Sequence, residues 1–336
     1  MQRSLRGLAI AAASISLAAC SANSAAPTQS SGLTPNVQRV PHGMRLLPGP
    51  MVAGPLLVSA VPLKPNAPAG WPDHKKKKKE LLFVSDSSSG VLIYDPTKAN
   101  SSPIGSITTG VNAPGGLAVD KKSNLYVDNL GGNTVTVYPP GKNSPSLTIS
   151  SGISGPYGIG VDSQGNVFVS NLNNNTVTAY KSGQTTPYET INFSPYGQAV
   201  GIGVDANDNV WVACDSTNAV FEIPAGSSGV KNSGLSSLNG PISVAFGQSD
   251  QIFVSNFAAQ DVNIYTYGTT SPSGTITSGI EQYGPTLGGF TAKDAYFQSN
   301  QGLNVVGYLK GQTTPFSTLS GASSPLGIAS SPLVKK

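Results

Sequence analysis

The stretch GIGVDSQGNVFVSNLNNNTVTAY, residues 158–180, contains three short apolar runs separated by two polar turns. GIGVD (158–162) is rich in glycine, which suits a strand that packs very closely against its neighbours. VFVS (167–170) and TVTAY (176–180) alternate between two faces with the period of two that β-strands have. A fourth run, YETINF (188–193), follows them. Together these residues predict one four-stranded antiparallel sheet.

The same pattern recurs along the chain. Five copies begin their second strand at Asn124, Asn166, Asn209, Gln251 and Asp294. The spacings between these starts are 42, 43, 42 and 43 residues, and the run from Leu81 onward adds a sixth copy. A period near 42 residues made of four-stranded units is typical of β-propellers.

Two aromatic positions repeat with the unit. One lies in the second strand and holds Phe83, Tyr126, Phe168, Trp211, Phe253 and Tyr296. The other ends the third strand and holds Tyr94, Tyr138, Tyr180, Tyr265 and Tyr308, with Ile223 in the fourth copy. Rings that recur at one position of every strand are usually packing residues, so we expect them to form the core between blades.

The two ends of the repeat region predict how the ring closes. The first copy begins at its second strand, near Leu81, whereas the run SPLGIASS (324–331) resembles an innermost strand with no unit after it. Pairing of these segments would remove the exposed edges of an open array. The sequence therefore predicts an all-β, six-bladed propeller over residues 80–332, in which the C-terminal strand completes blade 1.

The N-terminus has the features of an export signal. Arg3 and Arg6 precede an apolar stretch that is too short for an ordinary membrane span. LAAC (17–20) resembles the lipobox of bacterial lipoproteins, in which the cysteine is lipidated. We therefore predict a signal peptide over residues 1–20, a lipid anchor at Cys20 and a location in the bacterial envelope, at the outer membrane or cell surface.

The segment after the predicted signal peptide has the composition of a linker. Residues 21–79 are rich in Pro, Ser, Ala and Gly, show no period and end in the lysine run Lys75–Lys79, so we expect a disordered tether. Only 11% of the chain is charged and its net charge is +4, most of it from that run. This distribution gives no reason to expect a nucleic-acid partner.

The repeat resembles the NHL repeat, in which a Gly-Ile-Ala-Val-Asp strand, a turn and a Gly-Asn-Leu-Tyr-Val-Ser-Asp strand lead into an Asn-bearing loop. Residues 158–180 are closely similar to that pattern, and residues 116–138 nearly so. The resemblance implies a six-bladed propeller, a fold shared with gluconolactonase-like and strictosidine-synthase-like proteins. It implies no activity, because propellers include both enzymes and binding modules.

One face of the predicted ring is the first candidate for a binding surface. The loops between second and third strands and the loops that enter each next blade lie on this face. Asn129, Asn171 and Asn256 have the turn chemistry of asparagine, which favours a structural role. The residues that we expect at a binding rim are Tyr157, Tyr196, Tyr283, Asn173, Asn174 and Phe257. For the tyrosines, packing over neighbouring blades is an equally good interpretation.

The predicted propeller is poor in catalytic side chains. Both histidines, His42 and His74, lie in the linker, which argues against Ser-His chemistry and against the histidine-based mechanism of virginiamycin B lyase. Cys214 has no basic neighbour in sequence, so we expect a half-buried, unreactive thiol.

Carboxylates remain as candidate ligands for a metal. Asp120, Asp162 and Asp205 follow innermost strands and are interpreted as turn caps on the face opposite the rim. Weak candidates for a Ca²⁺ site near the rim are Asp86, Asp128, Asp215 and Glu281.

Two main functions follow from these features. The first is a lipid-anchored binding or scaffolding module that takes up an envelope glycan or protein. The alternative is a metal-dependent lactonase or lyase that uses carboxylates at the channel mouth. A passive surface protein is a third hypothesis.

Overall fold

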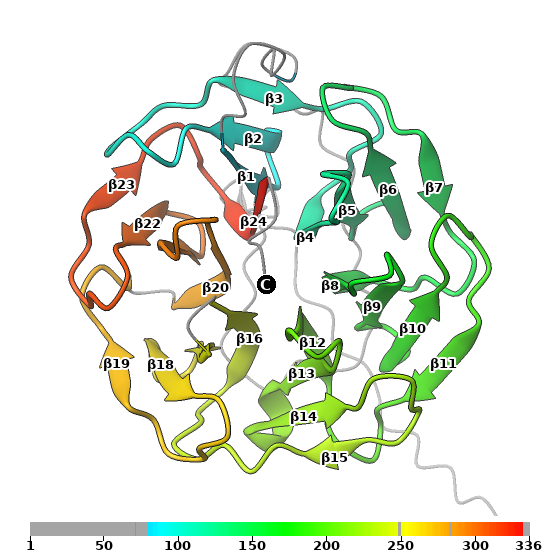
Figure 1. Ribbon diagram of the computed structural model, residues 1–336. Coiled ribbons are helices and arrows are strands. Elements are labelled where there is room, and N and C mark those ends of the chain that lie inside the picture. Colours follow the sequence, from blue (N-terminus) through cyan, green and yellow to red (C-terminus); the bar gives the residue numbers. More distant parts are fainter. Residues whose placement is uncertain (1–70, 72–79, 248–249, 282–283, 332–336) are drawn as a thin grey trace, which may run out of the picture. The chain divides into compact units, whose positions relative to one another are not determined.

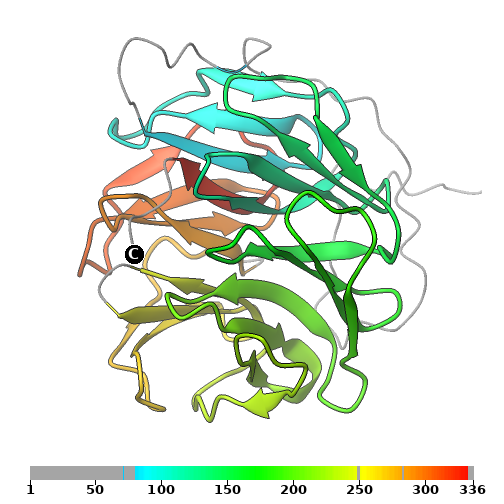
Figure 2. The same cartoon turned by 45° about the vertical axis from the view of Figure 1, so that its right-hand side comes forward.

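The computed structural model describes residue 71 and residues 80–247, 250–281 and 284–331. In this part of the chain, strands β1 to β24 form six four-stranded antiparallel sheets. The sheets are arranged as blades around a common axis (Figure 1, Figure 2). The predicted six-bladed propeller is therefore confirmed. Cys20, Lys75–Lys79 and Tyr283 lie outside the described residues.

The strands of blades 1 to 3 are given from the axis outward. Blade 1 contains β24 (Pro325–Ser331), β1 (Leu81–Asp86), β2 (Gly90–Tyr94) and β3 (Gly105–Ile107). Blade 2 contains β4 (Pro114–Val119), β5 (Leu125–Asn129), β6 (Thr134–Tyr138) and β7 (Leu147–Ile149). Blade 3 contains β8 (Pro156–Val161), β9 (Val167–Asn171), β10 (Thr176–Tyr180) and β11 (Glu189–Asn192).

Blades 4 to 6 repeat this order. Blade 4 contains β12 (Ala199–Val204), β13 (Val210–Cys214), a short 3₁₀ turn η1 (Asp215–Thr217), β14 (Ala219–Ile223) and β15 (Lys231–Asn232). Blade 5 contains β16 (Pro241–Phe246), β17 (Gln251–Asn256), β18 (Asp261–Thr266) and β19 (Gly274–Ile276). Blade 6 contains β20 (Pro285–Phe290), β21 (Tyr296–Asn300), β22 (Asn304–Tyr308) and β23 (Ser317–Leu319). Across all described residues, no helix has the length and apolar character that crossing a bilayer requires.

The C-terminal strand closes the ring as predicted. β24 pairs antiparallel with β1, with Leu81 opposite Ser331 and Phe83 opposite Ala329. At the other end of this pair, the buried carboxylate of Asp86 accepts hydrogen bonds from the backbone N–H groups of Ser323 and Ser324, both at 2.7 Å. The first and last segments of the propeller are therefore held by a strand ladder and by one buried acidic side chain.

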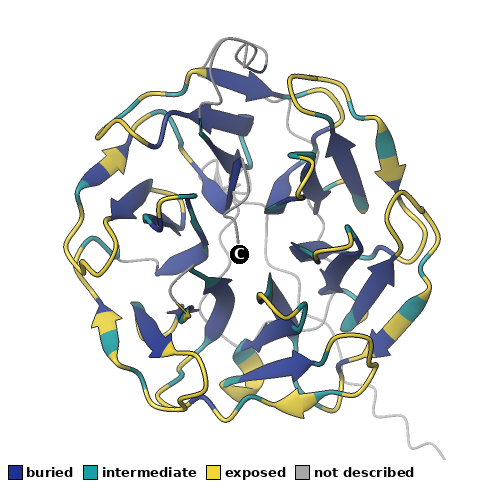
Figure 3. Ribbon diagram, in the orientation of Figure 1, coloured by how far each residue is buried: buried dark blue, intermediate teal, exposed yellow. Residues whose placement is uncertain are grey.

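The core lies between adjacent blades rather than inside one of them. Trp211 of blade 4, for example, belongs to a buried cluster with Val244, Ile252 and Tyr265 of blade 5. The inner three strands of each blade are mostly buried, whereas some of the short outer strands, such as β11 and β15, are largely exposed (Figure 3). This arrangement is what the repeated aromatic positions indicate.

In the five blades that have it, the tyrosine near the end of the third strand joins the blade to the preceding one. Its hydroxyl donates to a backbone carbonyl in the loop that enters its own blade, at 2.7 to 2.9 Å. The pairs are Tyr94 with Ser320, Tyr138 with Thr109, Tyr180 with Ser151, Tyr265 with Ser236 and Tyr308 with Ser278. Each ring fills the core while its polar end is satisfied, which is why tyrosine rather than phenylalanine recurs here.

In blade 6, the aromatic residue that we predicted for the second strand, Tyr296, is wrong by one position. Phe253 pairs with Ala245 across β16 and β17, and the residue that pairs with the corresponding Gly289 is Phe297. Tyr296 instead pairs with Phe290. A shift of one residue moves a side chain to the other face of its strand, so Tyr296 faces blade 5 and Phe297 faces blade 1.

Candidate functional site

A cavity, which we call the funnel, lies on the axis of the propeller. It has a volume of about 530 Å³ and is lined by the second halves of all six innermost strands, β4, β8, β12, β16, β20 and β24. These strands surround the axis in Figure 1. The funnel opens on the face that carries the turns of Asp120, Asp162 and Asp205, which we call the aspartate face. The opposite face, which carries the Asn171-type loops, is called the asparagine face.

Small residues set the width of the funnel. A Cβ atom at Gly201 or Gly203 would collide with the carbonyl oxygen of Ile242 or Val244 in the next blade. At Gly158 a Cβ would lie 2.5 Å from the carbonyl oxygen of Val200. The innermost strands therefore approach one another backbone to backbone, as the glycine-rich runs predict, and only part of the axis remains open.

The wall of the funnel is mainly apolar. Its side chains include Ile159, Ile202, Val204, Phe246 and Phe290. Toward the asparagine face the axis is filled by a buried cluster, which we call the apolar plug. Its members are Leu130, Tyr157, Leu172, Val200, Ile242 and Leu287, with Phe257 packed against them. The cavity is thus bounded at one end by the apolar plug.

The mouth of the funnel is polar, but its aspartates are already occupied. Asp162 accepts hydrogen bonds from the N–H groups of Gln164 and Asn166 and from the Asn166 side chain. Asp120 and Asp205 accept the equivalent bonds from their own turns. The prediction that these three residues cap turns on this face is confirmed. Lys121 also lines the mouth. Its side chain is exposed and does not cap a turn as the aspartates do.

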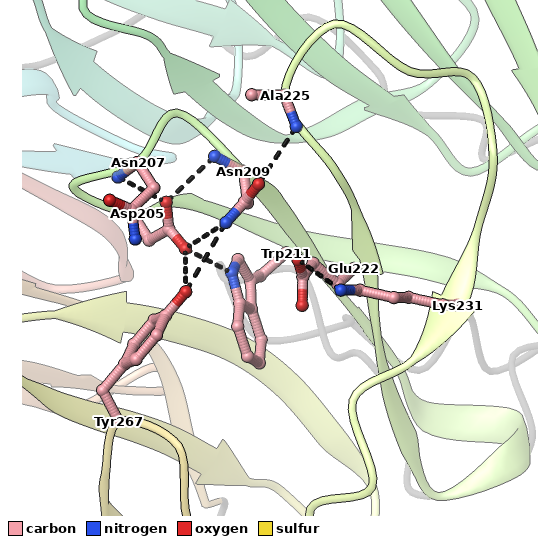
Figure 4. Close-up of polar contacts among 8 residues, drawn as sticks. All are labelled: Asp205, Asn207, Asn209, Trp211, Glu222, Ala225, Lys231 and Tyr267. Carbon is pink, nitrogen blue, oxygen red and sulfur yellow. Dashed lines mark hydrogen bonds and ion pairs between the residues drawn. The ribbon is translucent and has the colours of Figure 1, made fainter.

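The Asp205 turn has two additional donors (Figure 4). The indole N–H of Trp211 and the hydroxyl of Tyr267 donate to its Oδ2 at 3.0 and 2.9 Å. Tyr267 reaches this carboxylate from the loop that follows β18 in the next blade. The carboxylate of Asp205 is therefore a joint between blades 4 and 5 and has no oxygen free for an incoming cation.

Tyr157 does not lie at an exposed rim. Its side chain is fully buried in the apolar plug because the strand β8 already begins at Pro156. Burial, with the charges of Asp128 and Asp215, raises the pKa of Tyr157. Its hydroxyl is buried without a hydrogen-bond partner among the described residues. The expectation that Tyr157 contacts a partner at the surface is therefore wrong.

The other rim residues do not form one aromatic surface. Tyr196 is half-buried and packs on Phe193 and Phe221, with ring centroids 5.6 and 5.3 Å away. Phe257 is half-buried against the plug. Asn173 is half-buried, and only Asn174 is exposed, where it accepts a hydrogen bond from Thr176. Tyr196 is therefore better interpreted as a packing residue than as a binding residue.

Asn129, Asn171 and Asn256 have the structural role that was predicted. All three are fully buried, and the side-chain oxygen of each accepts a backbone N–H bond, as Asn171 does from Ser154 at 2.9 Å. Cys214 occupies the same position in blade 4. It is buried completely rather than half-buried, and this burial raises the pKa of its thiol to about 12.

The candidate metal ligands are dispersed or occupied. Asp86 accepts two backbone N–H bonds from the closing segment, and Asp128 accepts two from Gly115 and Gly116. Burial raises the pKa of Asp128 to about 8, and burial also raises that of Asp215. Glu281 is exposed. Among the described residues, no three His, Cys, Asp or Glu side chains are grouped so that they can hold a metal ion.

Sequence reasoning placed the candidate site on the asparagine face, whereas the funnel opens on the aspartate face. The funnel residues were visible only as short aliphatic strands, and their role depends on the width of the closed ring. One feature of the sequence could have indicated the funnel. Two neighbouring copies have a phenylalanine at the same position, directly before a turn, namely Phe246 and Phe290. Those two rings line the funnel of blades 5 and 6, where the other blades have smaller residues.

Comparison with known proteins supports the fold and nothing finer. No protein-family model matches the chain, and no curated protein matches it. A nidogen/laminin complex structure matches with a TM-score of 0.59 at 13% identity, covering 76% of this chain and 100% of that chain. A streptogramin B lyase structure matches with a TM-score of 0.53 at 13% identity, covering 77% of this chain and 89% of that chain.

A chain of Kuenenia stuttgartiensis hydrazine synthase is a third similar structure. Its TM-score is 0.50 at 15% identity over 61% of this chain, which spans only 65% of that chain. The propeller fold is thus shared with proteins of several different functions, including a lyase. At these identities the similarity concerns the fold alone.

Proposed function

We propose that this protein is a binding module that holds an apolar group of its partner in the axial funnel. The observation that supports this most directly is the cavity of about 530 Å³ with aliphatic and aromatic walls. Ligand sites in proteins usually have volumes of roughly 300 to 1,000 Å³, mainly apolar walls and a few polar groups near the opening. The funnel has each of these properties.

The mouth favours a ligand that also has a negative charge. Lys121 is the cationic side chain among the residues that line the cavity. The nearby carboxylates of Asp162 and Asp205 are neutralised in part by the N–H groups that they bind. An apolar body with an anionic end would place its body against Ile159 and Ile202 and its charge near Lys121. The glycan or protein partner expected from sequence fits this proposal through an apolar group rather than through a polar sugar face.

Location in the envelope is part of the proposal. The LAAC sequence supports lipidation of Cys20, and the length of residues 21–79 would separate the propeller from the membrane surface. Replacing Cys20 with Ser should abolish incorporation of labelled palmitate in bacterial cells and release the protein from the membrane fraction. Unchanged labelling of Cys20→Ser would contradict the anchor.

A metal-dependent lactonase or lyase is the weaker alternative. The carboxylates that it would use are bound to backbone N–H groups, as Asp86 and Asp128 are. Recruiting either one to a metal would leave those buried donors unsatisfied, which costs about 1–3 kcal/mol each.

Two fluorescent probes test the funnel. Anilinonaphthalene sulfonate is apolar and anionic, and phenylnaphthylamine is apolar and neutral. We expect both to gain fluorescence with the wild-type protein. Ala118→Trp adds an indole from β4 to the cavity wall and should remove both signals. Lys121→Glu should weaken binding of the anionic probe only.

The control places the same indole on an exposed outer strand, in Thr148→Trp of β7. This variant should bind both probes like the wild type. If Ala118→Trp folds normally and still enhances both probes, they bind elsewhere and the funnel is not the site.

A further inference from the structure

A second cavity lies on the outer wall, at the seam between blades 5 and 6. It has a volume of about 180 Å³. Its lining includes Phe253, Phe290, Tyr296 and Tyr308, together with Gly274 of β19. We call it the seam pocket. It shares Phe290 with the funnel but is otherwise lined by different residues.

The corresponding seam between blades 1 and 2 is filled by a tryptophan from outside the propeller. Trp71 packs on Phe83 with ring centroids 4.9 Å apart and is 91% buried, with 9% of its surface exposed. Its backbone N–H donates to Oδ1 of Asn143 at 2.8 Å. Phe83 pairs with Ile93 and Phe253 pairs with Ile264, so the two rings occupy the same position of their blades.

The loop contact of Trp71 also has its counterpart at the seam pocket. Tyr138 ends β6 and Tyr308 ends β22, opposite Leu125 and Tyr296 respectively. Counting from these tyrosines, Asn143 corresponds to Thr313, which lines the seam pocket. The protein itself therefore shows that this kind of seam accepts an indole.

At the seam between blades 4 and 5, a side chain of the propeller takes this place. Tyr267 lies 6.1 Å from the ring of Trp211, measured between centroids, and donates to Asp205 (Figure 4). By the same counting from Tyr265 and Tyr308, the residue of blade 6 that corresponds to Tyr267 is Lys310. Its amine forms an ion pair with Asp294 at 3.1 Å.

With a lysine in place of the tyrosine, no ring from this position covers the cavity, although Phe253 already packs on Phe290 and Tyr296. The side chain of Lys310 is 60% exposed, so it covers little of the pocket. The adjacent Leu309 is 52% exposed and continues the apolar surface outward. The seam pocket is therefore a cavity at a place that Trp71 fills between blades 1 and 2 and Tyr267 covers between blades 4 and 5.

We propose that the seam pocket binds an aromatic side chain, best a tryptophan, carried by an extended peptide segment of a partner protein. The ring would rest on Phe253 and Phe290 edge to face, as Trp71 does on Phe83. The segment would run past Leu309 and Thr313, with the Lys310–Asp294 ion pair at its side. Aromatic residues buried in such pockets provide much of the binding energy of protein interfaces.

A short peptide tests the proposal. The probe is the acetylated and amidated peptide AGWPD, which has the sequence of residues 69–73, added to the full-length protein and followed by titration calorimetry. Lys310→Tyr should fill the pocket as Tyr267 fills its own seam and weaken binding by at least about tenfold. Lys310→Gln removes the charge but adds no ring, so it should bind within about twofold of the wild type.

A second blocking variant guards against loss of folding. A Cβ atom at Gly274 would contact only Ile264, at 3.8 Å, so Gly274→Leu can enter the pocket without backbone strain. It should also prevent binding, whereas Thr148→Leu on an exposed outer strand should not. The same peptide with Ala for Trp should not bind.

The outcome separates this site from the funnel. Binding that survives Ala118→Trp but is lost in Lys310→Tyr supports the seam pocket. Binding that is lost in Ala118→Trp and kept in Lys310→Tyr assigns the peptide to the funnel and overturns the seam proposal. No binding by the wild type also overturns it.

Discussion

The ring is closed by the β1–β24 ladder and by one buried carboxylate, so Asp86→Ala is the most informative stability variant. Asp86 is fully buried and accepts four hydrogen bonds. Two come from the backbone N–H groups of Ser323 and Ser324 at 2.7 Å, and two come from Ser88, from its N–H at 3.1 Å and its hydroxyl at 2.6 Å. The first two join residues 237 and 238 positions apart in the chain.

The size of the effect follows from these contacts. Hydrogen bonds to a charged group each contribute about 1.5–3 kcal/mol, and a buried donor left unsatisfied costs about 1–3 kcal/mol. The desolvation of the carboxylate in the native protein offsets part of this gain. We expect Asp86→Ala to lower the free energy of unfolding by about 3–4 kcal/mol, which for a domain of this size lowers the Tm by roughly 6–16 °C.

The assay is urea unfolding, followed by tryptophan fluorescence, with hydrogen exchange of the β24 amides. Asp162→Ala is the matched control, because the donors to Asp162 come from its own turn. It should cost less and leave exchange in β24 unchanged. If Asp86→Ala is within about 0.5 kcal/mol of the wild type, or if β24 stays fully protected, the carboxylate does not hold the closure.

Three further predictions concern buried side chains. Trp71→Ala should lower the free energy of unfolding by about 2–4 kcal/mol in urea titrations, because it empties the seam beside Phe83; an unchanged midpoint would show that Trp71 adds no stability. Burial raises the pKa of Asp128 to about 8, so the unfolded chain loses this proton at lower pH than the native protein does, and stability should fall as the pH rises from about 4 to about 8. Asp128→Ser, which has the residue found at Ser85 and Ser170, should remove that part of the pH dependence in urea titrations at pH 5 and pH 8; equal pH dependence in both proteins would argue that Asp128 is ionised in the fold. Cys214, with a thiol pKa raised to about 12, should resist iodoacetamide at pH 8 until urea unfolds the protein, and rapid native labelling would contradict its burial.

Much of the architecture was determined by local sequence. The blade count, the antiparallel order of strands and the closure by residues 325–331 follow from repeats whose strand and turn signals agree in almost every copy. The turn roles of Asp120, Asp162 and Asp205 were predictable for the same reason. In each case the donors within the turn lie no more than four residues from the carboxylate.

What the sequence left open depends on contacts between blades. GPYG (155–158) resembles a loop, but β8 begins at Pro156 and carries Tyr157 into the apolar plug, because its pairing with β9 continues past an irregularity to Asn171. A strand shifted by one residue in blade 6 exchanged the faces of Tyr296 and Phe297. The funnel and the seam pocket are set by how closely six sheets approach one axis and by which side chain, Tyr267 or Lys310, reaches across a seam. The period of the sequence thus determined the blades, whereas the spaces between them, and with them the candidate sites, were decided only by packing in the closed ring.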